Sequence, residues 1–315
     1  MFARGILLHG GNDALKLTLL PRLAAGKLIA SVACCESTVE FDANALPATQ
    51  AGTSESGIVL NGVKRFVSPA TSVDGYIVSA RDGGEHALFW VPASSAGLTL
   101  TIVPRADGTH SGALSLIDVQ TDAAHRIGCG EQACLALAMA VDEAIVMTSA
   151  ELFGVMDAAL AITLDYMKTR VQFGKPIGSF QALQHRAVDL YIQKELALGA
   201  VDDAVRGLDR GVDAKRRSLL ASRAKSRCAD AALMITRDAI KLHGAIGFAD
   251  ECDIGLYLQR ALVLSAWLGN GATHRRRYSR LTLDDAALTP SKTGASAVFK
   301  QPGAESARQS EPGRD

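Results

Sequence analysis

The segment Lys168–His185, KTRVQFGKPIGSFQALQH, carries the residues whose types and spacing best suit chemistry. Arg170, Phe173 and Lys175 stand where one stretch of helical apolar periodicity ends and another begins. An arginine can bind a diphosphate through paired hydrogen bonds, and an aromatic ring can lie beside a flat ligand. The same residues also suit a helix end, where Arg170 complements the helix dipole and Phe173 packs the corner. The residue types alone leave both interpretations open.

A second candidate is Gly128–Ala133, GCGEQA, which fits the dinucleotide-binding pattern G-x-G-x-x-A and opens a helical stretch. The residues before it, TDAAHRI, make a poor buried strand, and no alternation of strands and helices follows. We therefore expect the entry to a long helix, whose free N–H groups could still bind an anion.

Metal chemistry is not indicated. The seven histidines show no H-x-x-x-H spacing, and the six cysteines contain no C-x-x-C pair. Cys34 and Cys35 would point to opposite faces of an extended chain, so they make poor joint ligands. We expect the cysteines to be reduced, mostly as small core residues.

Composition excludes several classes of protein. The chain has 315 residues, of which 48% are hydrophobic and 21% charged, and 33 basic residues balance 33 acidic ones. A zero net charge argues against a protein that binds nucleic acid through excess cationic charge. No apolar run approaches the roughly 20 residues that span a bilayer, and the N-terminus lacks a secretory core. We expect a cytoplasmic protein with no membrane span.

The secondary structure that positions these residues is predicted to change from short strands to long helices near residue 125. Residues 1–27 predict a helical stub, and residues 28–125 a small antiparallel β domain with a hairpin turn at Asn61-Gly62. Residues 126–288 predict a four-helix bundle, because long Ala- and Leu-rich stretches repeat at helical spacing. Residues 289–315 lack apolar periodicity and predict a disordered tail. The fold class is therefore α+β.

Four segments together resemble the acyl-CoA dehydrogenase family. The run R-x-Q-F-G-x-P-I-x-x-F-Q-x-x-x-H resembles the link between two of its bundle helices, and KLHGAIGF resembles its Q-x-H-G-G-x-G-[YF] loop. LNGVKRF is similar to its L-N-G-x-K-x-W hairpin, and LLPRLAAGKLIASVA to the entry of its middle domain. The matches occur in family order over about residues 15 to 280, which makes the resemblance specific.

The resemblance implies an FAD enzyme that removes two hydrogens from an acyl-CoA thioester. In the family a carboxylate takes the α-proton and flavin N5 accepts the β-hydrogen as hydride. An α-proton of a thioester is weakly acidic, so the base must be desolvated and positioned. The implied partners are the acyl-CoA, further subunits in a homo- or hetero-oligomer (dimer or tetramer), and an electron-accepting flavoprotein. The implied setting is fatty acid or acyl-CoA metabolism.

The resemblance also assigns cofactor-binding residues. The FAD of the family lies between the β domain and the bundle, and part of its site comes from a neighbouring subunit. Arg170 and Phe173 would contact the FAD of a partner chain, and Lys241 and Gly244 its diphosphate or adenosine end. The residues expected beside the flavin ring are Phe66, Ser68 and Cys35.

The chain departs from the family at the base. The family loop Y-E-G-T is here Trp267–His274, WLGNGATH, which puts Gly269 at the Glu position. Some members place the Glu on the first bundle helix, and that position is here Ala144. Its neighbour Glu143 is the remaining candidate catalytic residue, although one residue along a helix turns a side chain by about 100°. The N-terminal helical domain of the family is also missing from this sequence, and Lys241 replaces a family Gln.

Three functions stay open. The first is an acyl-CoA dehydrogenase-like flavoprotein, the second a non-catalytic subunit of a hetero-oligomeric acyl-CoA dehydrogenase, and the third a flavin oxygenase on the same fold. The missing carboxylate favours the second, and the third needs no carboxylate at the Glu position. A visible spectrum of the purified chain separates the first two, because only a flavin-binding chain is yellow on its own.

Overall fold

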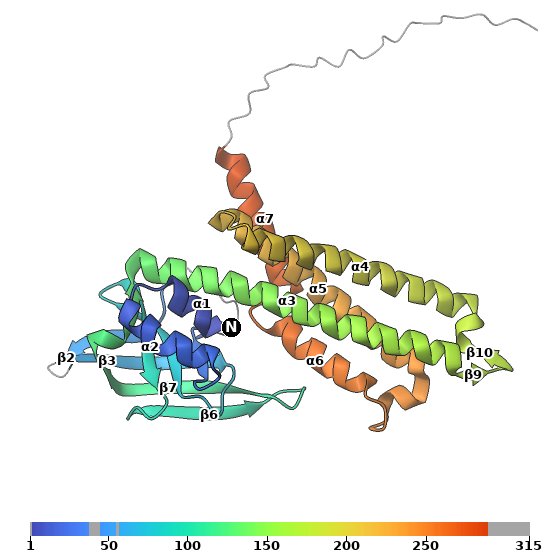
Figure 1. Cartoon of the computed structure of the whole chain (residues 1–315), viewed down its shortest axis with the longest axis horizontal. Helices are drawn as coiled ribbons and strands as arrows, with labels where there is room; N and C mark the ends of the chain where they lie inside the picture. The colour runs from blue at the N-terminus through green and yellow to red at the C-terminus, as the bar shows by residue number, and fades with distance from the viewer. Residues whose placement is uncertain (1, 38–44, 55–56, 289–315) are drawn as a thin grey trace, which may run out of the picture.

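A sheet occupies one end of the molecule, and long helices run from it to the other end (Figure 1). The structure, a computed structural model, describes residues 2–37, 45–54 and 57–288, with side chains up to residue 283. This is the α+β fold that the sequence predicted. The predicted disordered tail lies outside the described residues.

The sheet has eight strands in the order β6-β7-β3-β2-β4-β5-β8, and β1 pairs with β4. β1 and β2 run parallel to β4, and the other neighbours are antiparallel. The strands are β1 (Ala30–Ala33), β2 (Gln50–Ser54), β3 (Gly57–Val67), β4 (Gly75–Asp82), β5 (Glu85–Pro92), β6 (Leu98–Pro104), β7 (His110–Thr121) and β8 (Arg126–Cys129). The β4–β5 hairpin turns at Gly83-Gly84, both with positive φ, so that Asp82 pairs with Glu85.

The predicted hairpin turn at Asn61-Gly62 is wrong. Both residues lie inside β3, where Leu60 pairs with Val119 of β7 and Gly62 pairs with Leu116, so the extra residue of this bulge belongs to β7. Gly62 has φ +155°, and a Cβ there would lie 2.5 Å from Thr49 Oγ1. The Asn61 amide exchanges hydrogen bonds with Asp118 on β7. Asn-Gly therefore lies opposite a bulge within a continuous strand instead of ending one.

The helices are α1 (Phe2–His9), α2 (Asp13–Ala24), α3 (Gly130–Thr169), α4 (Gln181–Asp209), α5 (Ala214–His243), α6 (Ile254–Ala266) and α7 (Gly271–Leu288). Short 3-10 turns precede β8 (Ala123–His125), α4 (Ile177–Ser179) and α6 (Gly244–Phe248). A two-stranded hairpin, β9 (Val171–Gln172) and β10 (Lys175–Pro176), follows α3. Side-chain caps from Asn12 and Asp213 begin α2 and α5. Gly211, with φ +64°, follows the end of α4.

α7 is a helix that the sequence did not separate from the bundle. It packs against α5, and Arg277 reaches from it to the fully buried Asp142 on α3 at 2.7 Å. Asp142 also accepts a hydrogen bond from Ser218 on α5 at 2.7 Å. One buried carboxylate therefore ties three helices together.

α3 is the central helix. It contains an 18-residue window with a mean hydropathy of 1.7, which is long and apolar enough to cross a membrane by composition alone, contrary to expectation. In the fold α3 packs against α1, α4, α5 and α6. Burial against these helices accounts for the apolar composition of its inner face.

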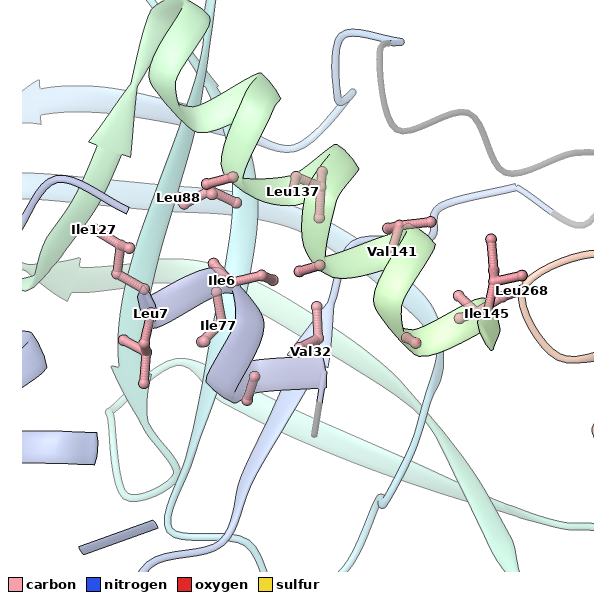
Figure 2. Close-up of a cluster of buried hydrophobic side chains, with 14 of the residues drawn as sticks. Ile6, Leu7, Val32, Ile77, Leu88, Ile127, Leu137, Val141, Ile145 and Leu268 are labelled. Atoms are coloured by element: carbon pink, nitrogen blue, oxygen red, sulfur yellow. The ribbon is translucent and has the colours of Figure 1, made fainter. Parts of the chain in front are cut away.

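The core between the sheet and α3 contains α1. Figure 2 shows Ile6 and Leu7 of α1 among Ile77 and Leu88 of the sheet and Leu137 of α3. Ile6 and Leu7 are at most 1% exposed. The predicted helical stub is therefore two helices, of which the first joins the β domain to the bundle.

Candidate functional site

A cleft between the sheet and the helices holds two adjoining cavities. The first, of about 540 Å³, is here called the ring cavity; it is bounded by the segment after β1, the end of β3, the β6–β7 turn and the α6–α7 connection. Its lining includes Cys35, Phe66, Arg105, Ser111, Trp267, Leu268, Gly269 and Asn270. Two of the residues expected beside a flavin ring, Cys35 and Phe66, thus meet the connection that replaces the family's Y-E-G-T loop.

The second cavity, of about 510 Å³, is here called the chain cavity and runs along α3. Its α3 wall consists of Ala144, Met147, Thr148, Ala150 and Glu151. All but Ala150 follow the i, i+3, i+4, i+7 spacing that places residues on one helical face. α1 closes one side with Phe2, whose ring lies edge-to-face with Trp267 at 6.3 Å between centroids. Both cavities share Arg105, Val263 and Trp267 in their linings, so they adjoin there.

Glu143, the candidate base from the sequence, faces away from both cavities. Its Oε1 lies 2.9 Å from His9 Nε2 on α1, and it lines neither cavity. Ala144, one residue on, does line the chain cavity. The rotation of about 100° per residue explains the difference.

Among the described residues that line the two cavities, Glu151 is the one carboxylate. It lies about two helical turns beyond Ala144 on the same face of α3. Sequence reasoning missed it. The available signal was the spacing of seven residues from Ala144, but it acquires meaning only once the wall of the cavity is known.

Glu151 belongs to an ion-pair network across the cleft. Its Oε1 accepts hydrogen bonds from Arg260 on α6, and Arg260 Nη1 donates to Asp107 in the β6–β7 turn at 2.6 Å. Burial lowers the pKa of Arg260, but its bonds to Glu151 and Asp107 outweigh that effect and raise the pKa. The network therefore joins α3, α6 and the sheet.

The residues near the expected flavin ring come from the ends of strands. Phe66 has φ +55° and its side chain is 50% exposed beside the ring cavity. Ser68 follows β3, lines the chain cavity and accepts a hydrogen bond from Arg105 at 3.1 Å. The pKa of the Cys35 thiol is lowered by a hydrogen bond from Cys34 and by nearby Lys64, against the effect of burial.

A buried ion pair holds the Cys35 segment against the sheet. Lys64 on β3 is fully buried, and its Nζ donates to Glu36 Oε1 at 2.5 Å and to Ser79 Oγ at 3.0 Å. Glu36 also accepts from the backbone and hydroxyl of Thr49, at 2.8 and 2.6 Å. Burial would raise the pKa of Glu36, but the bonds from Lys64 and Thr49 lower it to about 2. Cys35 is thereby fixed beside the ring cavity.

Two buried basic side chains, Lys225 and His274, donate hydrogen bonds to backbone carbonyls at the α6–α7 connection. Lys225 on α5 donates to the carbonyls of Leu264 and Trp267, and burial lowers its pKa to about 7. His274 is 2% exposed and its Nε2 donates to the Leu268 carbonyl at 2.9 Å; burial lowers its pKa to about 4. His274 is therefore neutral at pH 7, and the connection presents no carboxylate at Leu268 or Gly269.

The remaining predicted residues lie at the opposite end of the bundle, where α3, α5 and the β9–β10 hairpin meet (Figure 1). Arg170 ends α3, and Phe173 is 91% exposed with φ +53° at the hairpin turn. Lys241 pairs with Asp238 at 3.1 Å, and Gly244 ends α5 with φ +71°. Tyr166 and His243 stack at 4.3 Å and bring these two helix ends together. We call the four predicted residues at this end, Arg170, Phe173, Lys241 and Gly244, the distal cluster.

The distal cluster cannot share a ligand with the cleft of the same chain. Roughly 26 residues of α3 separate Ala144 from Arg170, which is about 39 Å at 1.5 Å per residue. The sequence-predicted residues therefore fall into two groups, one at each end of α3.

The ring cavity fits a flat aromatic group. The Phe66 ring and the apolar residues Leu262, Val263, Ala266 and Trp267 line it, and Cys35, Ser111 and Asn270 offer polar atoms. Planar ligands are commonly held by apolar surfaces with a few placed polar groups. An isoalloxazine ring has this shape and chemistry.

Comparison with known proteins gives a consistent assignment. Residues 136–282 match the family of acyl-CoA dehydrogenase C-terminal domains. An acyl-CoA dehydrogenase of Bacillus subtilis is 29% identical over 286 residues, which cover 88% of this chain and 74% of that protein. The solved structure of the Tcur3481–Tcur3483 steroid ACAD (G363A variant) is 30% identical, with a TM-score of 0.79 and coverage of 91% and 75%. The ChsE4–ChsE5 complex of Mycobacterium tuberculosis is 25% identical, with a TM-score of 0.80 and coverage of 92% and 75%.

Proposed function

This chain belongs to the acyl-CoA dehydrogenase family, and we propose that it takes part in the FAD-dependent α,β-dehydrogenation of an acyl-CoA thioester. The observation that carries the proposal is the pair of adjoining cavities. The ring cavity has the aromatic and polar lining suited to a flavin ring, and the chain cavity extends from it along α3. When bound, FAD would supply the acceptor for the hydride.

The residues of the chain would bind, orient and dehydrate the substrate. Val263 and Trp267 stand where the cavities adjoin, so they would exclude water from the reacting carbons. The proton acceptor is the weak part of the site. Glu151 is engaged with Arg260, Glu143 points away, and the α6–α7 connection carries no carboxylate at Leu268 or Gly269. We therefore propose a slow dehydrogenase when this chain acts alone.

The test is anaerobic bleaching of the bound flavin by a panel of acyl-CoA thioesters. Slow bleaching by at least one thioester supports the proposal. A purified chain that is yellow but is bleached by none of them contradicts it. A colourless chain that gains a flavin spectrum only with a homologous partner supports the non-catalytic subunit, the alternative that the missing carboxylate favours.

We propose that the cofactor site is completed by a second subunit, in a homo- or hetero-oligomer. The separation of about 39 Å along α3 prevents the distal cluster from reaching the cleft of its own chain. Exposed apolar side chains at that end, Phe173 at 91% and Phe248 at 79%, support a partner surface there. The similarity to the ChsE4–ChsE5 complex supports the same arrangement. Light scattering of the purified flavoprotein gives the number of subunits.

Arg170→Ala is expected to weaken FAD binding by about 10- to 100-fold, because a hydrogen bond to a charged group contributes about 1.5–3 kcal/mol. The melting temperature should change little, since an exposed helix-end arginine stabilises a fold by about 1 kcal/mol or less. The measurement is the FAD dissociation constant from fluorescence titration of the apoprotein. Arg210→Ala is the matched control, because Arg210 ends α4 as Arg170 ends α3. Equal dissociation constants for the two variants would remove Arg170 from the site.

The proposal also includes a cytoplasmic location and an electron-accepting flavoprotein as the partner that reoxidises the cofactor. All six cysteines are free thiols, as expected in a reducing compartment. Fractionation of the native organism with an antibody against this chain tests the location.

A further inference from the structure

Arg105 stands where the two cavities adjoin, immediately after β6. It lines both cavities, and its position is fixed by the β6–β7 turn, in which its backbone N–H donates to the Thr109 carbonyl at 2.9 Å. Its guanidinium donates from Nε to Thr109 Oγ1 at 2.9 Å and from Nη2 to Ser68 Oγ at 3.1 Å. Both of these partners are neutral hydroxyl groups.

The cationic charge of Arg105 has no contacting anion among the described residues. The neighbouring carboxylate, Asp107, is already bound by Arg260 at 2.6 Å and by the Thr109 hydroxyl at 2.6 Å. Arg260, the other arginine in the cavity linings, lies between Glu151 and Asp107. Burial lowers the pKa of Arg105, and the attraction of Asp107 does not restore it.

The hydrogen-bonding capacity of Arg105 is therefore incomplete. A guanidinium has five N–H donors, and the structure assigns partners to two of them, on Nε and on Nη2. An alkyl chain in the chain cavity would displace water from the remaining donors without replacing its hydrogen bonds. An oxygen atom on the ligand would accept from them and avoid that cost.

We infer that Arg105 binds an oxygen substituent on the acyl group, a keto or carboxylate oxygen, and so selects oxygenated acyl-CoA thioesters over plain alkyl ones. The inference rests on the proposed function, because it assigns the substrate class of the same cleft. Thr148 already donates to the Ala144 carbonyl and the Glu151 carboxylate only accepts, so among the residues of the α3 wall neither competes with Arg105 as the donor to that oxygen. The apolar remainder of the wall, with Val32, Met147 and Leu264, would contact the carbon skeleton.

The experiment compares three acyl-CoA thioesters of equal chain length that carry a terminal methyl, a keto group or a carboxylate. Their dissociation constants are measured by calorimetry on the flavin-loaded protein, and their kcat/KM by anaerobic bleaching. We expect the oxygenated thioesters to bind about 10- to 100-fold more tightly than the alkyl one, the range of a hydrogen bond to a charged group. A keto-over-carboxylate order, or the reverse, identifies which oxygen is preferred.

Arg105→Met is expected to reduce this preference to within about threefold, and Arg105→Lys to retain part of it, because an ammonium still donates. Arg280→Met is the control, since Arg280 is exposed on α7 and lines neither cavity. Melting temperatures of all variants show whether loss of the bonds to Thr109 and Ser68 unfolds the turn. If Arg105→Met does not fold, the inference is tested by the dissociation constants of the three thioesters for the wild-type protein and for Arg105→Lys.

Three outcomes would overturn the inference. The wild-type protein could bind the alkyl thioester as tightly as the oxygenated ones, or Arg105→Met could keep the preference. Arg105→Met could instead lose its flavin, which would make Arg105 a contact of the ring. Failure of the proposed function looks different: no thioester bleaches the flavin, while calorimetry still reports whether binding depends on Arg105.

Discussion

Lys64→Met is expected to lower the free energy of unfolding by about 3–5 kcal/mol, the usual loss when one partner of a buried ion pair is removed. Lys64 is fully buried, and the variant would leave Glu36 with only its bonds to Ala48 and Thr49. The segment that presents Cys35 to the ring cavity would lose its anchor. Urea denaturation followed by far-UV circular dichroism measures the difference.

The control for this variant is Lys16→Met. Lys16 pairs with Asp13 at 3.2 Å, and Asp13 is 87% exposed, so this pair is expected to contribute about 1 kcal/mol or less. A Lys64→Met protein as stable as Lys16→Met would contradict the anchoring role of the buried pair.

The same ion pair makes stability depend on pH. The pKa of Glu36 falls from 4.5 to about 2 in the folded protein, so the unfolded chain binds the proton first as the pH drops. The contribution of Glu36 is fully present above about pH 4.5 and is lost as the pH falls towards 2. Midpoints of urea denaturation measured from pH 6 to pH 2.5 should decline in the wild-type protein. Lys64→Met should show a weaker decline, and an identical decline would assign the acid sensitivity to other carboxyl groups.

Leu268→Glu is expected to raise the rate of acyl-CoA-dependent flavin bleaching by about 10²- to 10⁴-fold, the usual contribution of general acid–base catalysis. Leu268 lines the ring cavity and already adopts φ +55°, so the replacement adds no backbone strain. Gly269, the position that the sequence suggested, is less suitable. It has φ +99°, and a Cβ there would lie 3.0 Å from His274 Nε2.

Leu268→Gln is the matched control, because an amide of the same shape does not accept a proton near neutral pH. Equal bleaching rates for the two variants would contradict the view that the site lacks only a carboxylate. Fast bleaching of the unmodified chain that is abolished by Glu143→Gln or Glu151→Gln would instead identify the native base.

Local patterns in the sequence predicted the long helices well. The Ala- and Leu-rich stretches at helical spacing that predicted a bundle over residues 126–288 contain α3, α4, α5 and α6. Asn61-Gly62 misled because a glycine with positive φ can also lie within a strand opposite a bulge, and only the pairing with β7 distinguishes this from a turn. The predicted helical stub did not resolve α1 from α2, because the eight residues of α1 carry too little periodicity to identify a separate helix.

The candidate site was only partly predictable, for a different reason. Cys35, Phe66 and Ser68 were found because they belong to motifs, and the structure brings them to one cleft. Arg105 and Glu151 belong to no motif, and they become candidates only when β6, α3 and α6 are placed around a common cavity. A side chain that reaches a site only through the packing of elements far apart in the chain has no local sequence pattern that identifies it.

The length of α3 has a consequence for how this chain tolerates change. One unbroken helix carries the chain cavity on one part and the distal cluster at its end. Its length therefore fixes both the distance between the two and their relative rotation about the helix axis. Deleting one residue between Glu151 and Arg170 would shorten α3 by about 1.5 Å but rotate its far end about the helix axis by about 100°. Deleting seven residues would shorten the helix by about 10.5 Å but rotate its far end by only about 20° from its original orientation. Insertions and deletions in this stretch are therefore constrained by angle more tightly than by distance.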